Sequence, residues 1–246
     1  MRIAVAGGTG QAGSEAVATA RSRGHDVVVL ARSTGIDLVS GDGVAAALDG
    51  VEAIIDASGV RGNIDPTGFH KAVIRNLARG GARHLVVLSI VGCDRAASYA
   101  LYGGKLAQEH AAEASGVPFT IARTTQFHEF SRQIWHIGHK GPMHFAPRMR
   151  TQPVAVAEVG ARLVDLAEAE PVGGRAADFG GPREESLVEM VRAYAQATGL
   201  SPRIVPVSLP GDFGRAQRDG SLLPGSDAVL GAQTFDEWLT LQRAES

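Results

Sequence analysis

Short apolar segments separated by stretches of helical character constrain the fold of this 246-residue chain more than any other feature. The segments are rich in Val, Ile and Leu and cover residues 2–6, 25–31, 51–57, 83–89 and 118–123. Because they do not alternate with polar residues, they indicate strands buried on both faces, as in a parallel sheet. Helical stretches lie between them, at 13–23, 42–49, 66–79 and 98–115. The pattern therefore predicts an α/β fold with a doubly wound, Rossmann-like parallel sheet.

The regular alternation ends after residue 123. Residues 1–123 are predicted to form a dinucleotide-binding core, and residues 124–246 a C-terminal substrate-pocket part packed on the same sheet as one structural unit. In this second part we expect helices at 157–168, 184–198 and 234–243, and strands at 175–179 and 203–207. Segment 127–145 is rich in aromatic and histidine residues, as a pocket wall would be. Ligands of such folds bind at the carboxyl edge of the sheet, so the second part is expected to cover that edge and supply a substrate pocket.

Composition limits the classes of partner. The formal net charge of −2 gives no electrostatic footprint for nucleic acid or an anionic membrane. The single cysteine, Cys93, excludes an internal disulfide and is expected to be a small packing residue. We expect no targeting segment ahead of the strand at 2–6, and no apolar run reaches the roughly 18 residues of a membrane span. These observations predict a cytoplasmic protein, monomer or homodimer, that acts on a small molecule.

A glycine motif, Gly7-x-x-Gly10-x-x-Gly13, lies directly after the first predicted strand and opens the first predicted helix. In that context the first glycine permits a sharp turn, the second lets the backbone approach a pyrophosphate, and the third allows close packing. The partial positive charge of the helix N-terminus adds to the attraction. The motif predicts nucleotide binding by the whole loop, with Thr9, Gln11 and Ala12 between its glycines.

The end of the second predicted strand distinguishes between the two nicotinamide dinucleotides. An acidic residue there holds the ribose 2′-hydroxyl of NAD, whereas a basic residue accommodates the 2′-phosphate of NADP. This chain has Arg32 and Ser33 and no carboxylate. The sequence therefore favours NADP(H). The alternative is that Arg32 is a solvated surface charge and that the protein also accepts NAD(H).

Three ordered segments, "AIIDASG", "HLVVLSIVG" and "GGKLAQEHAAEASGVPFTIARTTQFHEF", carry a family resemblance together with the glycine loop and Arg32. The chain resembles an atypical short-chain dehydrogenase/reductase of the NmrA-like, NAD(P)H-binding type. The resemblance implies that Asp37 and Leu38 contact the adenine. It also implies that Ala57, Ser58 and Gly59 lie along the cofactor. Ser89 would face the nicotinamide, and Lys105 would hold its ribose. The nicotinamide and the substrate would be bordered by Thr124, Thr125 and Phe127.

One departure from this superfamily concerns proton transfer. Its members carry a tyrosine four residues before the lysine, where the lysine charge lowers the phenol pKa. Here Leu101 occupies that place, with Tyr99 and Tyr102 six and three residues before Lys105. Tyr102 lies about 60° around the helix from Lys105, so its ring can reach a similar region. The alternatives are that Tyr102 packs on the helix flank and that Lys105 only pairs with Glu109.

The candidate catalytic residues are therefore Tyr102, Lys105, Ser89 and His128. His128, which lies beside Glu129, is the candidate that would replace the absent proton donor. Three further histidines at 136, 139 and 144 lack accompanying cysteines or acids, so no metal is expected.

The sequence predicts an NAD(P)H-dependent reductase that transfers hydride to a small or aromatic carbonyl, quinone or enone, in keeping with secondary metabolism. A quinone or an activated enone can accept hydride mainly through positioning, without strong proton assistance. The alternative is an NmrA-like regulatory protein that senses NAD(P) without turnover.

Overall fold

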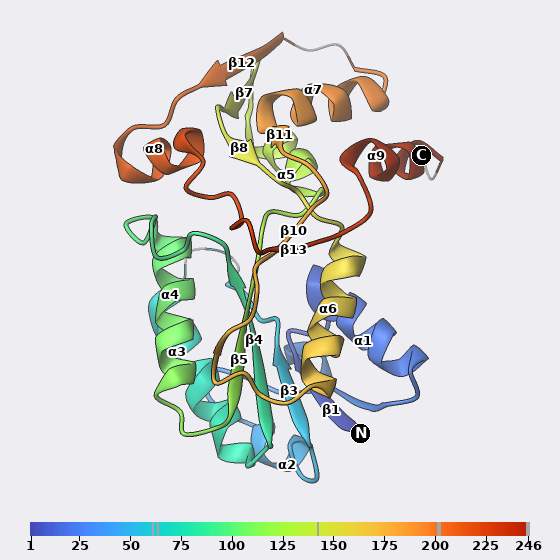
Figure 1. Cartoon of the computed structure of the whole chain (residues 1–246), viewed down its shortest axis with the longest axis vertical. Helices are drawn as coiled ribbons and strands as arrows, with labels where there is room; N and C mark the ends of the chain where they lie inside the picture. Colours follow the sequence, from blue (N-terminus) through green and yellow to red (C-terminus); the bar gives the residue numbers. More distant parts are fainter. Residues whose placement is uncertain (61, 63, 142, 201–202, 245–246) are drawn as a thin grey trace. The chain divides into compact units, whose positions relative to one another are not determined.

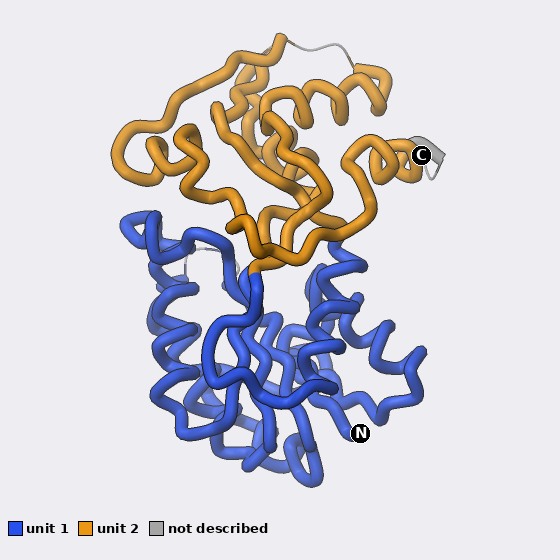
Figure 2. The backbone as a smooth tube through the Cα atoms, viewed as in Figure 1, with its two compact units in different colours: residues 1–123, 156–177 blue, residues 124–155, 178–246 orange. Residues whose placement is uncertain are grey.

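The computed structural model describes residues 1–60, 62, 64–141, 143–200 and 203–244, which form two compact units (Figure 2). Unit 1 contains residues 1–123 and 156–177, and unit 2 contains residues 124–155 and 178–246. The chain leaves unit 1 after Arg123 and returns to it for 156–177, a segment that the sequence analysis assigned to the C-terminal part.

Unit 1 is built on a parallel sheet in the order β5-β4-β3-β1-β2, with a short strand, β9, beside β5. The strands are β1 (Arg2–Ala6), β2 (Asp26–Leu30), β3 (Ala53–Asp56), β4 (His84–Ile90), β5 (Phe119–Thr124) and β9 (Gly174–Arg175). Every residue of β3 is buried, whereas β2 is partly exposed because it forms the edge of the sheet. The expected doubly wound α/β fold is confirmed.

Two pairs of helices cover the two faces of this sheet (Figure 1). The helices and helical turns of unit 1 are α1 (Gln11–Ser22), η1 (Arg32–Thr34), α2 (Val44–Ala47), α3 (Pro66–Leu77), η2 (Ala78–Gly80), α4 (Ala100–Glu113) and α6 (Val156–Glu168). Helices α3 and α4 lie on one side of the strands, α1 and α6 on the other. Helix α3 begins at Pro66 because the side chain of Asp65 accepts hydrogen bonds from the next free backbone N–H groups, those of Thr67 and Gly68.

Glycines permit the close approach of these helices. A Cβ on Gly160 of α6 would lie 2.4 Å from the Cβ of Glu15 on α1. A Cβ on Gly104 of α4 would lie 2.4 Å from the Cβ of Pro66 at the start of α3. The first contact ties α6 to unit 1, although residues 124–155 of unit 2 precede it in the chain.

Unit 2 is made of shorter elements. They are α5 (Phe130–Ile137), β6 (His139–Lys140), β7 (Met143–Pro147), β8 (Arg150–Thr151), β10 (Phe179–Gly180), β11 (Glu185–Ser186), α7 (Leu187–Ala197), β12 (Arg203–Val207), α8 (Gly211–Asp219), β13 (Val229–Leu230) and α9 (Phe235–Ala244). Strands β12, β7 and β6 form one sheet, β11 pairs with β8, and β10 pairs with Thr124 and β13. Met190 on α7 packs with Phe235, Trp238 and Leu239 on α9.

The sequence patterns located most helices and strands but missed several short ones. The predicted strand at 203–207 agrees with β12, and the predicted helices at 157–168, 184–198 and 234–243 agree with α6, α7 and α9. The single strand expected at 175–179 is wrong, because the chain forms two short strands there, β9 and β10. Helices α5 and α8 were not predicted. Within the described residues, no helix is long and apolar enough to cross a membrane.

His70 is a buried titratable residue on α3. Its side chain is fully buried, and neither ring nitrogen has a hydrogen-bond partner among the described residues. Burial, with a smaller contribution from the charge of Lys105, lowers its pKa to about 2. The folded protein therefore holds His70 in its neutral form across the physiological pH range.

This burial predicts a loss of stability in weak acid. The unfolded chain binds a proton at His70 below its ordinary pKa of 6.5, whereas the folded protein binds it only near pH 2. Stability therefore falls as pH drops through that window, by about 2 kcal/mol between pH 7 and pH 5. We expect His70→Leu to remove this part of the pH dependence in urea unfolding measured at both pH values. His110→Gln, at an exposed position on α4, serves as the control, and an unchanged pH dependence in His70→Leu would contradict the assignment.

Candidate functional site

The glycine motif forms a tight turn between β1 and α1. Gly7 adopts a positive φ of 71°, and the N–H of Gly10 donates to the Gly7 carbonyl at 2.8 Å. Gly10 is the N-cap of α1, and the first turn of this helix carries no acidic residue. The first N–H groups of a helix have no intrahelical acceptor, so the turn presents donors and partial positive charge.

Two glycines let the backbone segments of this turn approach more closely than a side chain would allow. A Cβ on Gly13 would lie 2.1 Å from the carbonyl oxygen of Gly7. A Cβ on Gly7 would lie 2.8 Å from the Cα of Ser58, in the loop that follows β3. Thr9 and Gln11 are exposed at the turn, whereas Ala12 is buried. The turn is therefore a backbone cradle of the kind that fits a pyrophosphate.

The cradle lies where the sheet changes direction. Strands β2 and β3 flank β1 on opposite sides, so the connections that follow β1 and β3 diverge at the carboxyl edge. Such a switch point is where doubly wound sheets bind their ligands. The structure thus brings together the loop of Gly7 and the segment Ala57–Gly59, two of the predicted cofactor-binding segments.

Arg32 and Ser33 lie in η1, directly after β2, and both are exposed. Asp37 accepts hydrogen bonds from the backbone N–H groups of Ser40 and Val39, which lower its pKa. Its carboxylate therefore stabilises its own turn. The predicted adenine contacts of Asp37 and Leu38 remain predictions.

Asn76, a buried residue of α3, was missed by the sequence analysis. Its amide donates to the carbonyl oxygens of Leu38 and Val39 at 3.0 and 2.9 Å, which fixes the loop after β2. A polar residue among the apolar positions of a helix was the available signal.

Two residues at or just after the end of β3 and two on α4 form a buried ring of hydrogen bonds. The carboxylate of Asp56 accepts from the backbone N–H of Ser58 at 3.0 Å and from the amide of Gln108 at 2.6 Å. Gln108 in turn accepts from the ammonium of Lys105 at 2.9 Å, and Lys105 donates to the carbonyl of Ser58 at 3.4 Å. The ring encloses the backbone of Ser58, the residue against which Gly7 packs.

The ammonium of Lys105 is directed into unit 1. It also donates to the carbonyl of Leu88 at 2.9 Å, so its three N–H groups have three acceptors. Burial lowers the pKa of Lys105, and the negative charge of Asp56 opposes that shift. No hydrogen bond between Lys105 and Glu109 is present within the described residues. The predicted contact between Lys105 and a ribose hydroxyl remains a prediction. Such a hydroxyl would replace the longest of the three hydrogen bonds, the one to Ser58.

A second buried network surrounds Glu109. Arg123, near the end of β5, donates to both carboxylate oxygens of Glu109 at 2.8 and 2.7 Å, and also to Asp94 at 2.6 Å. Ser89 donates to Glu109 at 2.5 Å. Burial acts to raise the pKa of Glu109, but the bonds from Arg123 and Ser89 hold it below its usual value.

The Glu109 network also contains Cys93. Burial raises the pKa of the Cys93 thiol to about 12, so this side chain stays protonated. The structure thus places Ser89 with Glu109 and Cys93, a different network from that of Lys105.

Tyr102 is buried on α4, 4% exposed, and its ring centroid lies 6.1 Å from that of Tyr99. Leu101 is 39% exposed. The tyrosine nearest to Lys105 is therefore a buried residue of α4, and its predicted catalytic role remains a prediction.

The remaining predicted residues lie in unit 2. Thr125 donates to the carbonyl of Gln152 at 2.6 Å, and its N–H donates to Phe179 next to the Thr124–Phe179 bridge. Phe127 forms an isolated bridge with Val154. These contacts order the segment that follows β5.

His128 is fully buried in unit 2. Its Nε2 lies 3.1 Å from the carbonyl of Gln233, and its ring contacts those of Phe235 and Trp238. Glu129 accepts from the indole of Trp238 at 3.2 Å. Both residues therefore hold the start of α9, and their predicted role near the substrate remains a prediction.

The histidine-rich segment is organised by packing. The ring of His144 lies flat on Trp135, with centroids 3.6 Å apart, and His139 lies 4.7 Å from His144. His136 is exposed. Across the described part of the chain, no group of three or more His, Cys, Asp or Glu residues is arranged to hold a metal ion.

Comparisons with known proteins agree with this geometry. Residues 7–170 match the model of a family described as NAD(P)H-binding, so the chain belongs to that family. The match begins at Gly7, the first residue of the cradle. The expected membership of an NAD(P)H-binding family is confirmed.

One relative is the photosystem II assembly factor Ycf39 of Synechocystis, 27% identical over 241 residues that cover 85% of this chain and 71% of the relative. Among solved structures, the NADPH complex of the quinone oxidoreductase QOR2 from Escherichia coli has a TM-score of 0.75 at 16% identity. The NADP(H) complex of a triphenylmethane reductase from Citrobacter has a TM-score of 0.74 at 18% identity. In both cases the match covers 98% of this chain and 99% of the other. These similarities show a shared fold.

The buried ring predicts a specific stability effect. Gln108→Leu would leave Lys105 and Asp56 without the amide that joins them, so we expect a loss of about 2–4 kcal/mol in the free energy of unfolding. Gln133→Leu, at an exposed position on α5, should change it by less than about 0.5 kcal/mol. Urea unfolding of the two variants and the parent protein measures both effects. Equal losses in the two variants would show that the ring does not stabilise unit 1.

Proposed function

We propose that this member of the NAD(P)H-binding family is an oxidoreductase that transfers hydride to a small or aromatic carbonyl, quinone or enone. The observation that carries the proposal is the backbone cradle at the switch point, where Gly7 packs against Ser58 and Gly13 against Gly7. These glycines carry no side chain, so the backbone of the loop is open to the approach of a pyrophosphate. A reduced nicotinamide dinucleotide whose pyrophosphate is held by this cradle would supply the hydride.

NADP(H) is the proposed cofactor. Arg32 is exposed directly after β2, where its guanidinium can meet a 2′-phosphate. The neighbouring acid, Asp37, is engaged by the N–H groups of Val39 and Ser40, and it interacts electrostatically with Arg32. Arg32 is therefore the positive charge that this loop offers on the exposed side of η1, with the carboxylate of Asp37 beside it. NAD(H) is the alternative cofactor.

The arrangement of α4 favours acceptors that need little proton assistance. Lys105 is held by three acceptors inside unit 1, and a leucine occupies the position four residues before it. Leu101 has no phenol and the ammonium of Lys105 is held inside unit 1, so these two positions do not form a tyrosine–lysine pair. Quinones, activated enones and cationic dyes accept hydride mainly through positioning. Two proteins that share the fold are named quinone oxidoreductase and triphenylmethane reductase, which supports this substrate class.

The chain's own residues prepare the site by fixing the backbone around it. Lys105, Gln108 and Asp56 hold both backbone groups of Ser58, which keeps the loop after β3 against Gly7. Where an acceptor does require a proton, Tyr102 and His128 are the proposed donors.

Turnover tests the proposal directly. We expect the purified protein to oxidise NADPH in the presence of a quinone or a triphenylmethane dye, measured by the loss of nicotinamide absorbance. Tyr102→Phe and His128→Ala identify the proton donor if one is used. Activity that survives both changes would exclude both residues, and NADPH binding without turnover across the panel would reject the enzyme proposal.

The cofactor preference has its own test. Arg32→Ala should raise the KM for NADPH about tenfold and leave that for NADH unchanged, because only NADPH carries the 2′-phosphate. Arg21→Ala, at an exposed arginine in the last turn of α1, is the matched control. Equal effects on the two dinucleotides would contradict the role of Arg32.

A second candidate function is NAD(P) sensing without turnover. It is favoured by the engagement of Lys105 inside unit 1, and by the similarity to Ycf39, which is named an assembly factor. In this case the same cradle binds the dinucleotide and the protein responds through a partner. The turnover measurement distinguishes the two candidates.

A further inference from the structure

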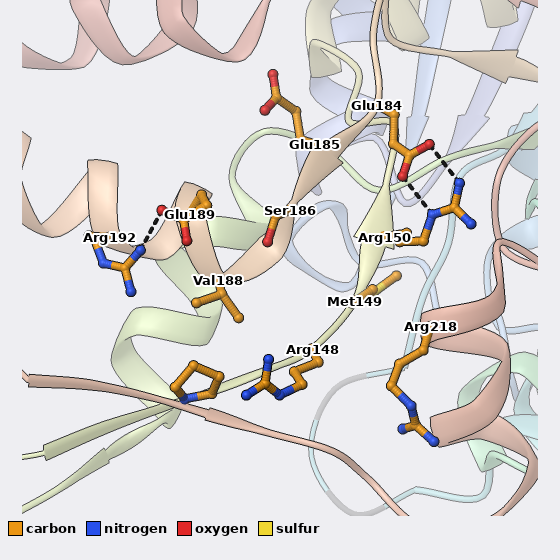
Figure 3. A pocket seen from close by; sticks show the side chains of 11 residues that line it. Arg148, Met149, Arg150, Glu184, Glu185, Ser186, Val188, Glu189, Arg192 and Arg218 are labelled. Carbon is orange, nitrogen blue, oxygen red and sulfur yellow. Dashed lines mark hydrogen bonds and ion pairs between the residues drawn. The ribbon is translucent and has the colours of Figure 1, made fainter.

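A cavity of about 470 Å³ lies within unit 2 (Figure 3). Its walls come from the β7–β8 connection and the start of β8, from β11 and the first turns of α7, from β12 and from α8. All of its lining residues belong to unit 2, whereas the glycine cradle belongs to unit 1. Its volume is within the range of pockets that bind small organic molecules.

The cavity combines apolar lining with cationic side chains. Met149 and Val188 are buried, and Pro206 is half-buried, so together they offer an apolar surface. Four arginines also line it: Arg148, Arg150, Arg192 and Arg218. A pocket of this composition suits a ligand with an apolar body and an anionic group.

Two of the arginines already have acidic partners. Arg150 forms a two-pronged ion pair with Glu184 at 2.6 and 2.9 Å, and Arg192 pairs with Glu189 one turn away. Both pairs are visible as dashed contacts in Figure 3. Their positive charge is therefore compensated before any ligand arrives.

The other two arginines lack an acidic partner among the described residues. Arg148 makes no ion pair there, and the guanidinium of Arg218 donates to the backbone carbonyl of Leu209 at 3.0 Å. Glu185, the third acid of the lining, is engaged by Arg183, which lies outside it. Four positive and three negative lining charges leave the cavity with a formal charge of +1. The uncompensated donors are concentrated on Arg148 and Arg218.

We propose that this cavity binds a small organic anion, with a carboxylate or phosphate group held by Arg148 and Arg218. The apolar part of the ligand packs on Met149, Val188 and Pro206. A guanidinium presents paired N–H donors that match either anionic group. The glutamates among the lining residues would repel an extended polyanion, so the geometry favours a single anionic group over nucleic acid.

Phenyl phosphate, benzoate and inorganic phosphate test the site in the full-length protein. Backbone amide NMR at low ionic strength follows residues 148–150 and 186–192, and it reports any binding at the glycine loop separately, through residues 8–12. We expect phenyl phosphate or benzoate to shift the first set saturably, and the tighter of the two identifies the anionic group. Inorganic phosphate should bind more weakly, because it lacks an apolar part.

Arg148→Gln and Arg218→Gln should each raise the dissociation constant of the tighter probe about tenfold. Arg215→Gln is the matched control, because Arg215 is exposed on the same helix as Arg218, pairs with Asp212 and does not line the cavity. Absence of saturable shifts at 148–150 and 186–192, or equal affinities in all variants, would overturn the proposal. Inorganic phosphate binding as tightly as phenyl phosphate would overturn the role of the apolar lining. None of these outcomes depends on whether the protein oxidises NADPH.

Discussion

The contact between the backbones of Gly7 and Ser58 is the constraint on which the carboxyl edge of unit 1 depends. It requires two loops to meet with no side chain between them, and it requires Ser58 to stay in place. The ring through Asp56, Gln108 and Lys105 meets the second requirement. A buried ammonium and a buried carboxylate would each be costly alone, and the Gln108 amide connects them while satisfying both. Charge burial is thus used to fix a backbone position.

Helix α4 supplies the polar side of this edge. Lys105, Gln108 and Glu109 occupy positions i, i+3 and i+4, which share one face of a helix. Lys105 and Gln108 join the ends of β3 and β4, while Glu109 receives Ser89 from β4 and Arg123 from β5. One buried helix face therefore connects three adjacent strands, each through a charged or amide side chain. This arrangement places Ser89 and Lys105, expected together beside a nicotinamide, in separate networks.

The sequence predicted the sheet of unit 1 because uninterrupted apolar runs have few alternatives to buried parallel strands. It did not predict the two-residue strands of unit 2, because elements that short carry no periodicity. Helix α5 did offer a signal that was overlooked, since Ser131, Ile134 and Trp135 share one buried face of it. Lys105, Gln108 and Glu109 look like a solvated helix face until their partners are known. The sequence did carry a signal for those partners, because Asp56 and Arg123 each lie at or near the end of an apolar strand. A charge in such a buried position is costly unless it is paired. Pairing them with α4 required the tertiary structure.

The same networks bear on whether a bound dinucleotide is used. A catalytic lysine needs its ammonium oriented toward a substrate, a ribose or a phenol, yet Lys105 directs its three N–H groups to acceptors within unit 1. Its longest hydrogen bond is the one to the carbonyl of Ser58. Ser58 is also the residue against which Gly7 of the glycine cradle packs. Exchange of that hydrogen bond for one to a ribose hydroxyl would preserve the bonds to Gln108 and Leu88. Lys105 can therefore keep the edge rigid and still contact a cofactor, which is compatible with hydride transfer to an acceptor that needs no strong proton donor.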